Sequence, residues 1–504
     1  MHNEIRKAMD LVVKCHMAWL DPEKNYYPTG GYEVAHDVGR WWDAMLRYES
    51  VTGIPIPEQA EKQMFNNIQA LMANPTGMLV GLPDIDWMKE KAKFNPHNIR
   101  ESFLALTALV KYRSSEWAEQ TGHRLLVTLK KIRNEDHTFD FMKMAALSGA
   151  PAHPGVIARS DKDGTTTFGR ALEAILLFYE ATGDKLAMEI AEGIASYHLS
   201  HTVNQDGTAV TGIFSPDNIG HNHSYLGTLR GLLLFGLKTG SDEYVHAVSH
   251  TYDRSLWENN ITWVGWAPHD LGKPRFNNED GDPEADPASC GDVAQIALWL
   301  AMYAGRDELY DDVERLVRAT LLSSQITEDL APRKKGAWGI HRHPFGQGVI
   351  LDVFAAVLHT LTDVYSNIFT IIDEDNININ MNFDIDSDQV NIQVTADEMR
   401  KVKVSMKKLA TLKIRVPGWV DKTKVQLKID GINVKNKVWD GQYIIIGKND
   451  LNDKSVIELI YDLPETVTVE IMKVSKKEFR LTWKGDEVVN CIPAVLIYPC
   501  VESK

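Results

Sequence analysis

Apolar residues in the first two thirds of the chain recur at steps of three and four, the spacing that one face of an α-helix produces. Five segments are apolar on nearly all sides and are expected to be enclosed helices: residues 38–48, 99–118, 170–181, 226–238 and 293–304. A glycine follows soon after each of them, and threonine precedes the first four of these glycines: Gly53, Gly122, Gly183, Gly240 and Gly305. Glycine adopts the left-handed conformation that commonly ends a helix, so each glycine is expected to mark a helix C-terminus.

These glycines lie about 57 to 69 residues apart, which leaves room for two helices and two connections in each interval. A second helix with a narrower apolar stripe is expected after each glycine, as in residues 186–197 and 309–321. Residues 349–363 supply a sixth enclosed helix. Six helix hairpins that close on themselves need no polar caps at their ends, so an (α/α)6 barrel is favoured over the alternative, an open solenoid.

From about residue 368 the apolar period changes to two, which predicts β-strands. The alternating segments are residues 377–383, 390–394, 425–429 and 443–446, with turn residues such as Asp430-Gly431 between them. The lysine-rich run at residues 399–408 is interpreted as a solvated edge. The chain is therefore predicted to be mainly α with a β domain: residues 1–367 form an (α/α)6-barrel catalytic domain, and residues 368–504 form a C-terminal β-sandwich.

Composition restricts the partners of this 504-residue chain. Its formal net charge of −15 argues against nucleic acid, because phosphate contacts need clustered lysine and arginine. The sequence has neither a long apolar run nor a signal-like start, so no membrane partner and a cytoplasmic location are expected. A homodimer is an assembly that the sequence allows. The four scattered cysteines form no disulfide or metal motif and are expected to be core thiols: Cys15, Cys290, Cys491 and Cys500.

The N-terminal ends of the enclosed helices carry most of the candidate chemistry. If these helices run parallel, their starts surround one mouth, where helix N-termini favour an acidic group or an anionic substrate. A histidine at a helix start is more often a cap or a core residue, but charged residues recur at corresponding positions of nearly every helix. These positions are His36, Asp37, Arg40, Trp41, His97, Glu101, Arg170, His221, His223, Tyr225 and Asp292.

Tryptophan near such charged groups is typical of carbohydrate sites, because indole rings stack on sugars while acids, arginines and histidines bind hydroxyls. Trp41 also fits a packing stripe, whereas Trp266 lies in an irregular stretch. That stretch, residues 261–289, is long for a loop without a function. Its carboxylates between residues 277 and 286 have three interpretations: a solvated tip, a Ca2+ loop without EF-hand spacing, or a lid whose Glu279 or Asp280 is a general acid.

Several short segments occur in an order and spacing that resemble a known enzyme family. They are Asp37-Val38-Gly39-Arg40-Trp41, His97 to Glu101, Glu180 to Asp184, Gly220-His221, Ser289-Cys290, Tyr310 to Arg315, Leu412 to Trp419 and Gly485 to Tyr498. In these segments the chain resembles the β-L-arabinofuranosidases of glycoside hydrolase family 127. The resemblance implies an (α/α)6 barrel followed by β-sandwich material.

The same resemblance exposes a missing metal site. Known members of the family hold zinc with one glutamate and three cysteines, one of which is the nucleophile, and use a separate glutamate as acid and base. Cys290 matches one of these cysteines, but the zinc-binding glutamate falls on Ala288, the cysteine pair near Gly348 and Val349, and the acid/base glutamate near Pro274. One thiol cannot hold zinc, so no metal and no cofactor is predicted. The family histidines at His97 and His221 match, whereas a third is replaced by Phe168.

The function predicted from these features is a glycoside hydrolase that releases a non-reducing-end sugar from an oligosaccharide or glycoside, an acidic sugar being one option. Catalysis is assigned to Asp37, Glu101 and either Glu279 or Asp280. The expected substrate-binding residues are His36, Arg40, Trp41, His97, Arg170, His221, His223, Tyr225 and Trp266. A carboxyl separation of about 5 Å would predict retention of configuration and one of about 6.5–9.5 Å inversion.

Two alternatives belong to other classes. A polysaccharide lyase or an unsaturated-glycan hydrolase would use Tyr225 or a histidine as base, with Arg40 or Arg170 neutralising a uronate. A non-catalytic glycan-binding or assembly subunit would explain the loss of the family's catalytic residues.

Overall fold

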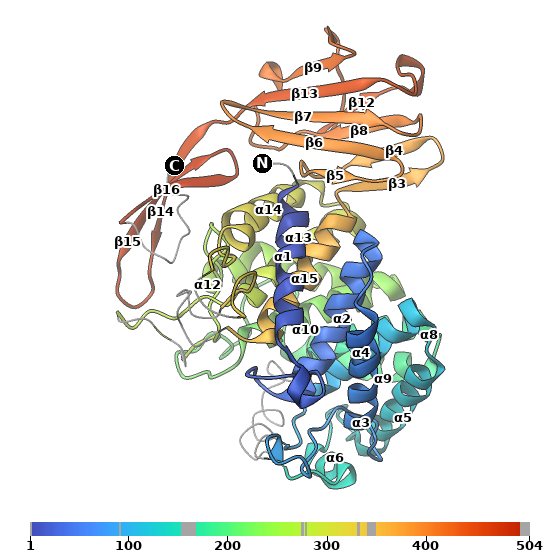
Figure 1. Cartoon of the computed structure of the whole chain (residues 1–504). Coiled ribbons are helices and arrows are strands. Elements are labelled where there is room, and N and C mark those ends of the chain that lie inside the picture. Colours follow the sequence, from blue (N-terminus) through green and yellow to red (C-terminus); the bar gives the residue numbers. More distant parts are fainter. Residues whose placement is uncertain are drawn as a thin grey trace. The chain divides into compact units, whose positions relative to one another are not determined.

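The computed structural model describes residues 3–89, 92–152, 168–273, 277, 280–329, 333–339 and 349–493. Its helical part is the predicted (α/α)6 barrel (Figure 1). The inner helices are α2 (Val34–Thr52), α4 (Asn98–Arg113), α8 (Ala171–Thr182), α10 (Asn222–Thr239), α13 (Pro287–Tyr303) and α15 (Leu351–Ser366). The outer helices are α1 (Glu4–Ala18), α3 (Glu58–Leu71), α5 (Glu116–Ile132), α9 (Lys185–His201), α11 (Asp242–Thr251) and α14 (Tyr310–Leu316).

Shorter elements fill the connections between these helices. They are β1 (Leu20–Asp21), β2 (Tyr27–Pro28), α6 (Phe141–Ser148), α12 (Trp257–Asn259) and π-helical turns at Tyr252–Leu256 and Val317–Leu322. In the described part of the chain, none of the helices combines the length and the apolar character that a membrane crossing requires.

The chain divides into two compact units. One comprises Val12–Ile296 and Ile326–His359, and it contains every candidate site residue named above. The other comprises Met1–Leu11, Ala297–Gln325 and Thr360–Lys504. The division passes through helices α1, α13 and α15, whereas the sequence placed a domain boundary after residue 367, between the end of α15 and the first strand of the sheets. That boundary stays a prediction.

Four of the five predicted helix-ending glycines end helices. Gly53, Gly183, Gly240 and Gly305 have φ between 68° and 71° and follow α2, α8, α10 and α13. The prediction is wrong for Gly122, which lies inside α5, because α4 already ends at Arg113.

Gly122 is a glycine for a different reason. A Cβ atom there would lie 2.2 Å from the ring of Phe178 on α8, so the missing side chain lets the two helices approach. Inner helices also approach through glycine: a Cβ on Gly39 of α2 would lie 2.8 Å from the carbonyl oxygen of Glu101 on α4. Close contact between α2 and α4 positions the charged side chains that both helices carry.

Helix α1 is the outer helix that the sequence analysis did not identify. Its buried residues Ile5, Met9 and Val12 recur at steps of four and three, the spacing of an amphipathic helix. Its C-terminal part packs on α15, since the rings of His16 and Phe354 lie 4.6 Å apart. This helix supplies the outer partner for the sixth inner helix.

The C-terminal part of the chain forms three sheets, and the two larger ones make the predicted β-sandwich. The first has the order β10-β9-β13-β7-β6-β5, the second β11-β12-β8-β4-β3 with β4 and β8 parallel, and the third β14-β15-β16. The strands are β3 (Phe369–Asp373), β4 (Asn376–Ile379), β5 (Ile385–Asp386), β6 (Val390–Ala396), β7 (Met399–Met406), β8 (Thr411–Arg415), β9 (Gln426–Ile429), β10 (Ile432–Asn433), β11 (Val438–Asp440), β12 (Tyr443–Ile446), β13 (Val456–Asp462), β14 (Glu465–Ile471), β15 (Glu478–Lys484) and β16 (Glu487–Ile492).

One prediction about these sheets is wrong. The lysine-rich run at residues 399–408 is not a sheet edge, because β7 lies between β13 and β6. Its alternate residues Val402, Val404 and Met406 are buried, while Lys401 and Lys403 lie on the other face. The long lysine side chains keep their charge in water from an internal strand.

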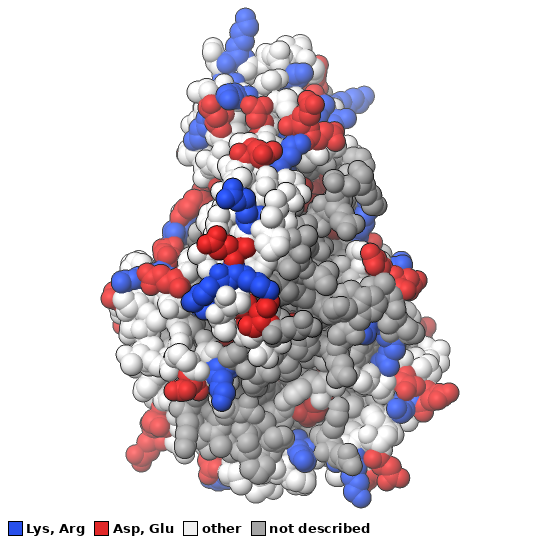
Figure 2. All heavy atoms as spheres, turned by 90° about the vertical axis from the view of Figure 1, so that its left-hand side faces the viewer, with Lys and Arg blue, Asp and Glu red and all other residues white. Residues whose placement is uncertain are grey.

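Charged side chains of both signs are interspersed on the face shown in Figure 2, where Lys and Arg lie among Asp and Glu. On this face the described residues form no extended patch of one sign. The absence of a nucleic-acid partner stays a prediction that rests on the net charge.

Candidate active site

Glu101 lies at the centre of a buried cluster of charges from three inner helices. Its Oε1 accepts hydrogen bonds from Arg170 Nη2 at 2.8 Å and from Arg100 Nε at 2.9 Å, and lies 3.2 Å from Arg40 Nε. Arg40 belongs to α2, Arg100 to α4, and Arg170 is the N-cap residue of α8. These contacts bring together three of the six inner-helix starts, as the repeat predicts.

The arginines keep Glu101 ionised. Burial alone would raise the pKa of Glu101, but Arg170, His36 and Arg40 outweigh burial and lower the pKa to about 2. The side chain has no exposed surface, so a sugar cannot contact it without a rearrangement. This geometry favours Glu101 as a positioning residue for the arginines, and its assignment to catalysis stays a prediction.

His36 lies between two carboxylates. Asn98 donates from Nδ2 to Glu33 at 2.8 Å, so its Oδ1 faces His36 Nδ1 at 3.1 Å and requires a proton there. The other nitrogen, Nε2, lies 3.7 Å from Glu101 Oε1 and 3.6 Å from Asp352 Oδ2. Burial would lower the pKa of His36, but the two carboxylates outweigh it and raise the pKa.

Asp352 is the site carboxylate with a partly exposed side chain, at 16%. It lies in the first turn of α15, where the helix N-terminus stabilises a negative charge. Burial would raise its pKa, but His36, Arg40 and Arg170 lower it. Sequence reasoning missed Asp352, although its place in the first turn of the sixth inner helix corresponds to the predicted positions on the other helices.

His223 is neutral and joins the arginines to Asp292. Its Nε2 accepts from Arg40 at 2.7 Å and Arg100 at 3.0 Å, so the ring proton resides on Nδ1, which donates to Asp292 Oδ2 at 2.5 Å. Burial, with Arg170 and Arg40, lowers the pKa of His223 well below its usual value. Burial raises the pKa of Asp292 to about 8, although Arg230 opposes the rise.

The charge network continues along the interior of the barrel. Arg230 lies 3.2 Å from Asp292 and 2.5 Å from Glu173. Farther on, His359 lies 2.7 Å from Asp43. The charged side chains in these contacts are paired, as burial requires, and the pairs join the inner helices that carry them.

Two histidines form a more exposed part of the site. Arg170 Nη1 lies 3.3 Å from His97 Nδ1, and the rings of His97 and His221 are stacked with centroids 6.4 Å apart. His97 is half-buried, and the side chain of His221 is 19% exposed. Together with Asp352, these histidines are the site residues that a ligand could contact directly.

Three other predicted site residues, all on inner helices, are buried. Trp41 and Tyr225 are buried; Trp41 packs edge-on against Trp42 at 5.2 Å, which favours a packing role. Asp37 is also buried, and its carboxylate lies against Gly31, where a Cβ would lie 1.9 Å from Oδ2.

The predicted loop residues are more scattered. Trp266 is buried, Asp280 is exposed, and Glu279 lies outside the described residues. The binding and catalytic roles assigned to all of these residues stay predictions.

The zinc site of the resembling family does not fit this chain. Cys290 is buried, and burial raises the pKa of its thiol, so the thiolate that zinc needs is disfavoured. Ala288 and Val349 offer no donor side chain, and Gly348 lies outside the described residues. No catalytic step is therefore derived through that metal or through a cysteine nucleophile.

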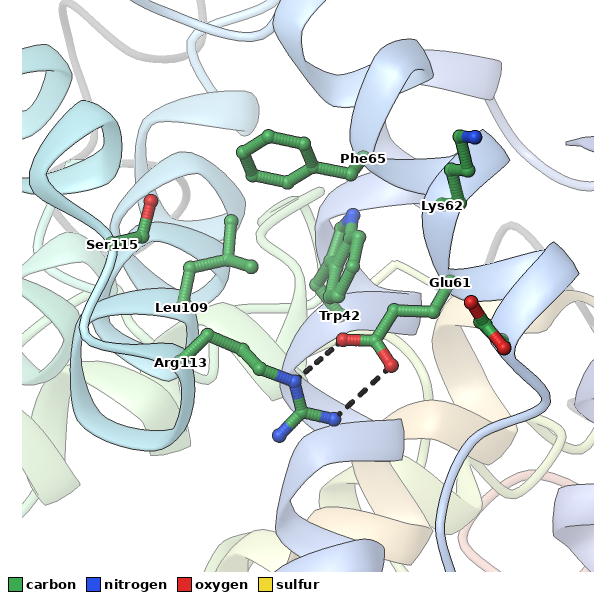
Figure 3. Close-up of a pocket in the computed structure, with 8 residues that line it drawn as sticks. Trp42, Glu61, Lys62, Phe65, Leu109, Arg113 and Ser115 are labelled. Carbon is green, nitrogen blue, oxygen red and sulfur yellow. Dashed lines mark hydrogen bonds and ion pairs between the residues drawn. The ribbon is translucent and has the colours of Figure 1, made fainter.

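A surface pocket of about 360 Å3 lies away from this site. Trp42, Phe65 and Leu109 line it, and an ion pair between Glu61 and Arg113 at 2.5 Å lies beside them (Figure 3). Arg113 ends α4, and Glu101 lies in its first turn, so about 18 Å of helix separates the pocket from the charged cluster.

Comparisons with known proteins agree with the sequence resemblance. Residues 363–463 match the family model of the β-L-arabinofuranosidase GH127 middle domain. No curated protein matches the chain.

Among solved structures, Ara127N, a GH127 β-L-arabinofuranosidase from Geobacillus stearothermophilus T6, is 14% identical with a TM-score of 0.58, over 90% of this chain and 76% of that chain. A GH127 β-arabinofuranosidase is 12% identical with a TM-score of 0.61, over 94% of this chain and 78% of that chain. The predicted resemblance is thus confirmed: residues 363–463 match the middle domain of glycoside hydrolase family 127, and the chain has the fold of these solved family 127 structures.

Proposed function

We propose that the protein is a glycoside hydrolase that releases a non-reducing-end sugar by a carboxylate mechanism. The observation that carries this proposal is the convergence of six inner-helix starts on one site, where the partly exposed carboxylate of Asp352 lies beside His36. The family resemblance supports the reaction class, and the absence of the family's thiol set supports carboxylates in place of cysteine.

Asp352 suits the role of nucleophile or general base. Its lowered pKa keeps it ionised near neutral pH, whereas a general acid must carry a proton. The acid would come from the loop at residues 277–286, in which Asp280 is exposed. His97, half-buried beside Arg170, would bind a sugar hydroxyl, and the half-buried ring of His221 stacked on it would contact the sugar.

The acidic-sugar option receives less support from the geometry. Arg40, Arg100 and Arg170 are buried and contact Glu101 or His223. A uronate carboxylate would need one of these guanidinium groups to leave a buried partner. A neutral sugar is therefore the proposed substrate, and a β-L-arabinofuranoside is the first to test.

The test is hydrolysis of a panel of aryl glycosides that includes the β-L-arabinofuranoside, with wild type and the Asp352→Asn variant. Loss of the carboxylate should lower kcat/KM by about 10²–10⁴-fold, with the thermal unfolding curve retained. The control is Asp363→Asn, the same change about three turns farther along α15, which should keep activity. Equal turnover by both variants would refute the role of Asp352.

A non-catalytic glycan-binding subunit is the second candidate. One observation favours it: of the described family positions, Cys290 alone keeps a zinc-site donor, and it is buried. Calorimetric binding of a glycan without hydrolysis of any glycoside in the panel would establish this function in place of the first. Tyr225 loses support as the base of the lyase alternative, because it is buried and its hydroxyl contacts Ser255; a histidine base stays a prediction.

A further inference from the structure

Three loop segments beside the site are joined to one another by backbone hydrogen bonds. The amide of Asn222 donates to the carbonyl of His269 at 2.9 Å, and the amide of His269 donates to Glu284 at 3.1 Å. The amide of Asp286 donates to the carbonyl of Ala267 at 2.9 Å. These bonds fix the relative positions of side chains that are up to 65 residues apart in sequence.

The joined segments bring two imidazoles and a carboxylate together. His221, His269 and Asp286 each offer one ligand atom, and these atoms lie within 4.8 Å of one another. His221 Nε2 lies 3.8 Å from Asp286 Oδ2, and the rings of His221 and His269 have centroids 4.5 Å apart. Asp286 and His269 are buried, while His221 is half-buried.

Each imidazole is oriented by a polar partner at its other nitrogen. His269 Nδ1 lies 2.9 Å from the carboxylate of Asp270, which directs Nε2 toward the group. His221 Nδ1 lies 3.2 Å from Ser224 Oγ and likewise leaves Nε2 on the side of Asp286. A carboxylate on the far nitrogen of a histidine is the usual outer partner at metal sites, where it fixes the tautomer and makes the ligand more basic.

Asp286 is also held in place. Its Oδ1 accepts the amide of Ala288 at 2.9 Å and its Oδ2 accepts the hydroxyl of Ser289 at 3.0 Å. These contacts cap the start of α13 and set the direction of the carboxylate. Tetrahedral zinc with bonds of about 2.0–2.1 Å needs ligand atoms about 3.3 Å apart, so ligand atoms that lie within 4.8 Å of one another would approach by at most about 1.5 Å to complete the geometry.

We propose that His221, His269 and Asp286 form a binding site for a divalent transition metal of the zinc class. Two nitrogens and one oxygen suit zinc, cobalt or nickel, whereas Ca2+ and Mg2+ prefer oxygen ligands alone. Three protein ligands leave a fourth position for water or a substrate hydroxyl, as in catalytic zinc sites. The donor set shares no residue with the glutamate and cysteines of the resembling family, and it does not depend on the proposed glycosidase activity.

The test measures bound metal on the full-length protein after loading with Zn2+ and removal of excess. Wild type should retain one equivalent, measured by mass spectrometry of the metal and by competition with a coloured chelator. His269→Ala and Asp286→Asn should each weaken binding by about 100-fold or more, and Asp270→Asn, which alters the outer partner, by about 10–100-fold. Asp286→Asn keeps an oxygen for the Ala288 amide, so it tests the charge without removing the helix cap.

A competing surface site provides the matched control. His246 and His250 are exposed on α11, four residues apart, with ring centroids 6.0 Å apart. The double variant His246→Ala/His250→Ala should keep the retained equivalent of zinc. Loss of zinc in this variant, with full retention by His269→Ala and Asp286→Asn, would overturn the proposal.

Cobalt substitution distinguishes the nitrogen and oxygen ligands from the nearby thiol. Co2+ bound to the proposed ligands should show d–d absorption without a thiolate-to-cobalt charge-transfer band, and Cys290→Ser should leave the spectrum unchanged. A strong charge-transfer band that Cys290→Ser abolishes would also overturn the proposal. Circular dichroism melting curves of each variant establish that the protein measured is folded.

Discussion

Replacing Glu101 by glutamine removes the charge that Arg40, Arg100 and Arg170 surround. In the folded protein the pKa of Glu101 falls from the ordinary 4.5 to about 2. A shift of that size corresponds to about 3 kcal/mol of stability. Breaking a buried ion pair by removing one partner costs about 3–5 kcal/mol. Glu101→Gln should therefore lower the free energy of unfolding at pH 7 by about 3–5 kcal/mol.

The pH dependence has a definite sign. Because the folded-state pKa of Glu101 is lowered, its contribution is fully present above the unfolded pKa of 4.5 and is lost as pH falls toward 2. Urea unfolding of wild type and Glu101→Gln at a series of pH values measures this directly. The difference in unfolding free energy should shrink as pH falls below about 4.5.

A surface carboxylate serves as the matched control. Glu189 pairs with Lys130 at 2.8 Å, and its side chain is 40% exposed. Glu189→Gln should change stability by about 0–1 kcal/mol, because water screens the pair. The reasoning about the buried cluster is refuted if Glu101→Gln is as stable as wild type at pH 7, or if its deficit stays constant down to about pH 2.5.

Two further predictions concern packing and the second compact unit. Gly122→Ala would place a methyl group against Phe178 and should lower stability by about 1–3 kcal/mol. Gly183→Ala, at a helix end with open space around it, should lower stability by about 1 kcal/mol through backbone strain alone. Thermal melting of both variants measures the difference. Asp486→Asn breaks the buried pairs with Arg318 and Arg400 and should lower the free energy of unfolding, measured in urea, by about 3–5 kcal/mol. A change below about 1 kcal/mol would contradict the ion-pair interpretation.

The helical and strand regions could be predicted because their periodic patterns are local. Glycine after an enclosed apolar helix marked the ends of α2, α8, α10 and α13 correctly. It failed at Gly122, where close packing against Phe178 requires glycine inside a helix. A single sequence does not distinguish a glycine needed for a left-handed turn from one needed for space. The residue is the same in both cases, and the neighbouring helix that makes space necessary is distant in the sequence.

The site was predictable in part for the same reason. His36, Arg40, Glu101, Arg170 and His223 all lie within about two turns of the starts of their helices, and the structure joins them in one network. The proposed metal ligand His269 has no such position, since it lies in the connection between α12 and α13. Its approach to His221 depends on backbone hydrogen bonds between two loops.

The sequence by itself determined the barrel, the sandwich and the ring of charged helix starts, because apolar spacing and helix ends depend on neighbours along the chain. The tertiary structure decided which charges can act. Glu101 became a buried carboxylate that is ionised at neutral pH and Asp352 the partly exposed carboxylate, although both lie in the first turn of an inner helix. Exposure and pKa are set by groups from distant segments, through burial and the nearest opposite charge, and only the folded chain brings those groups together.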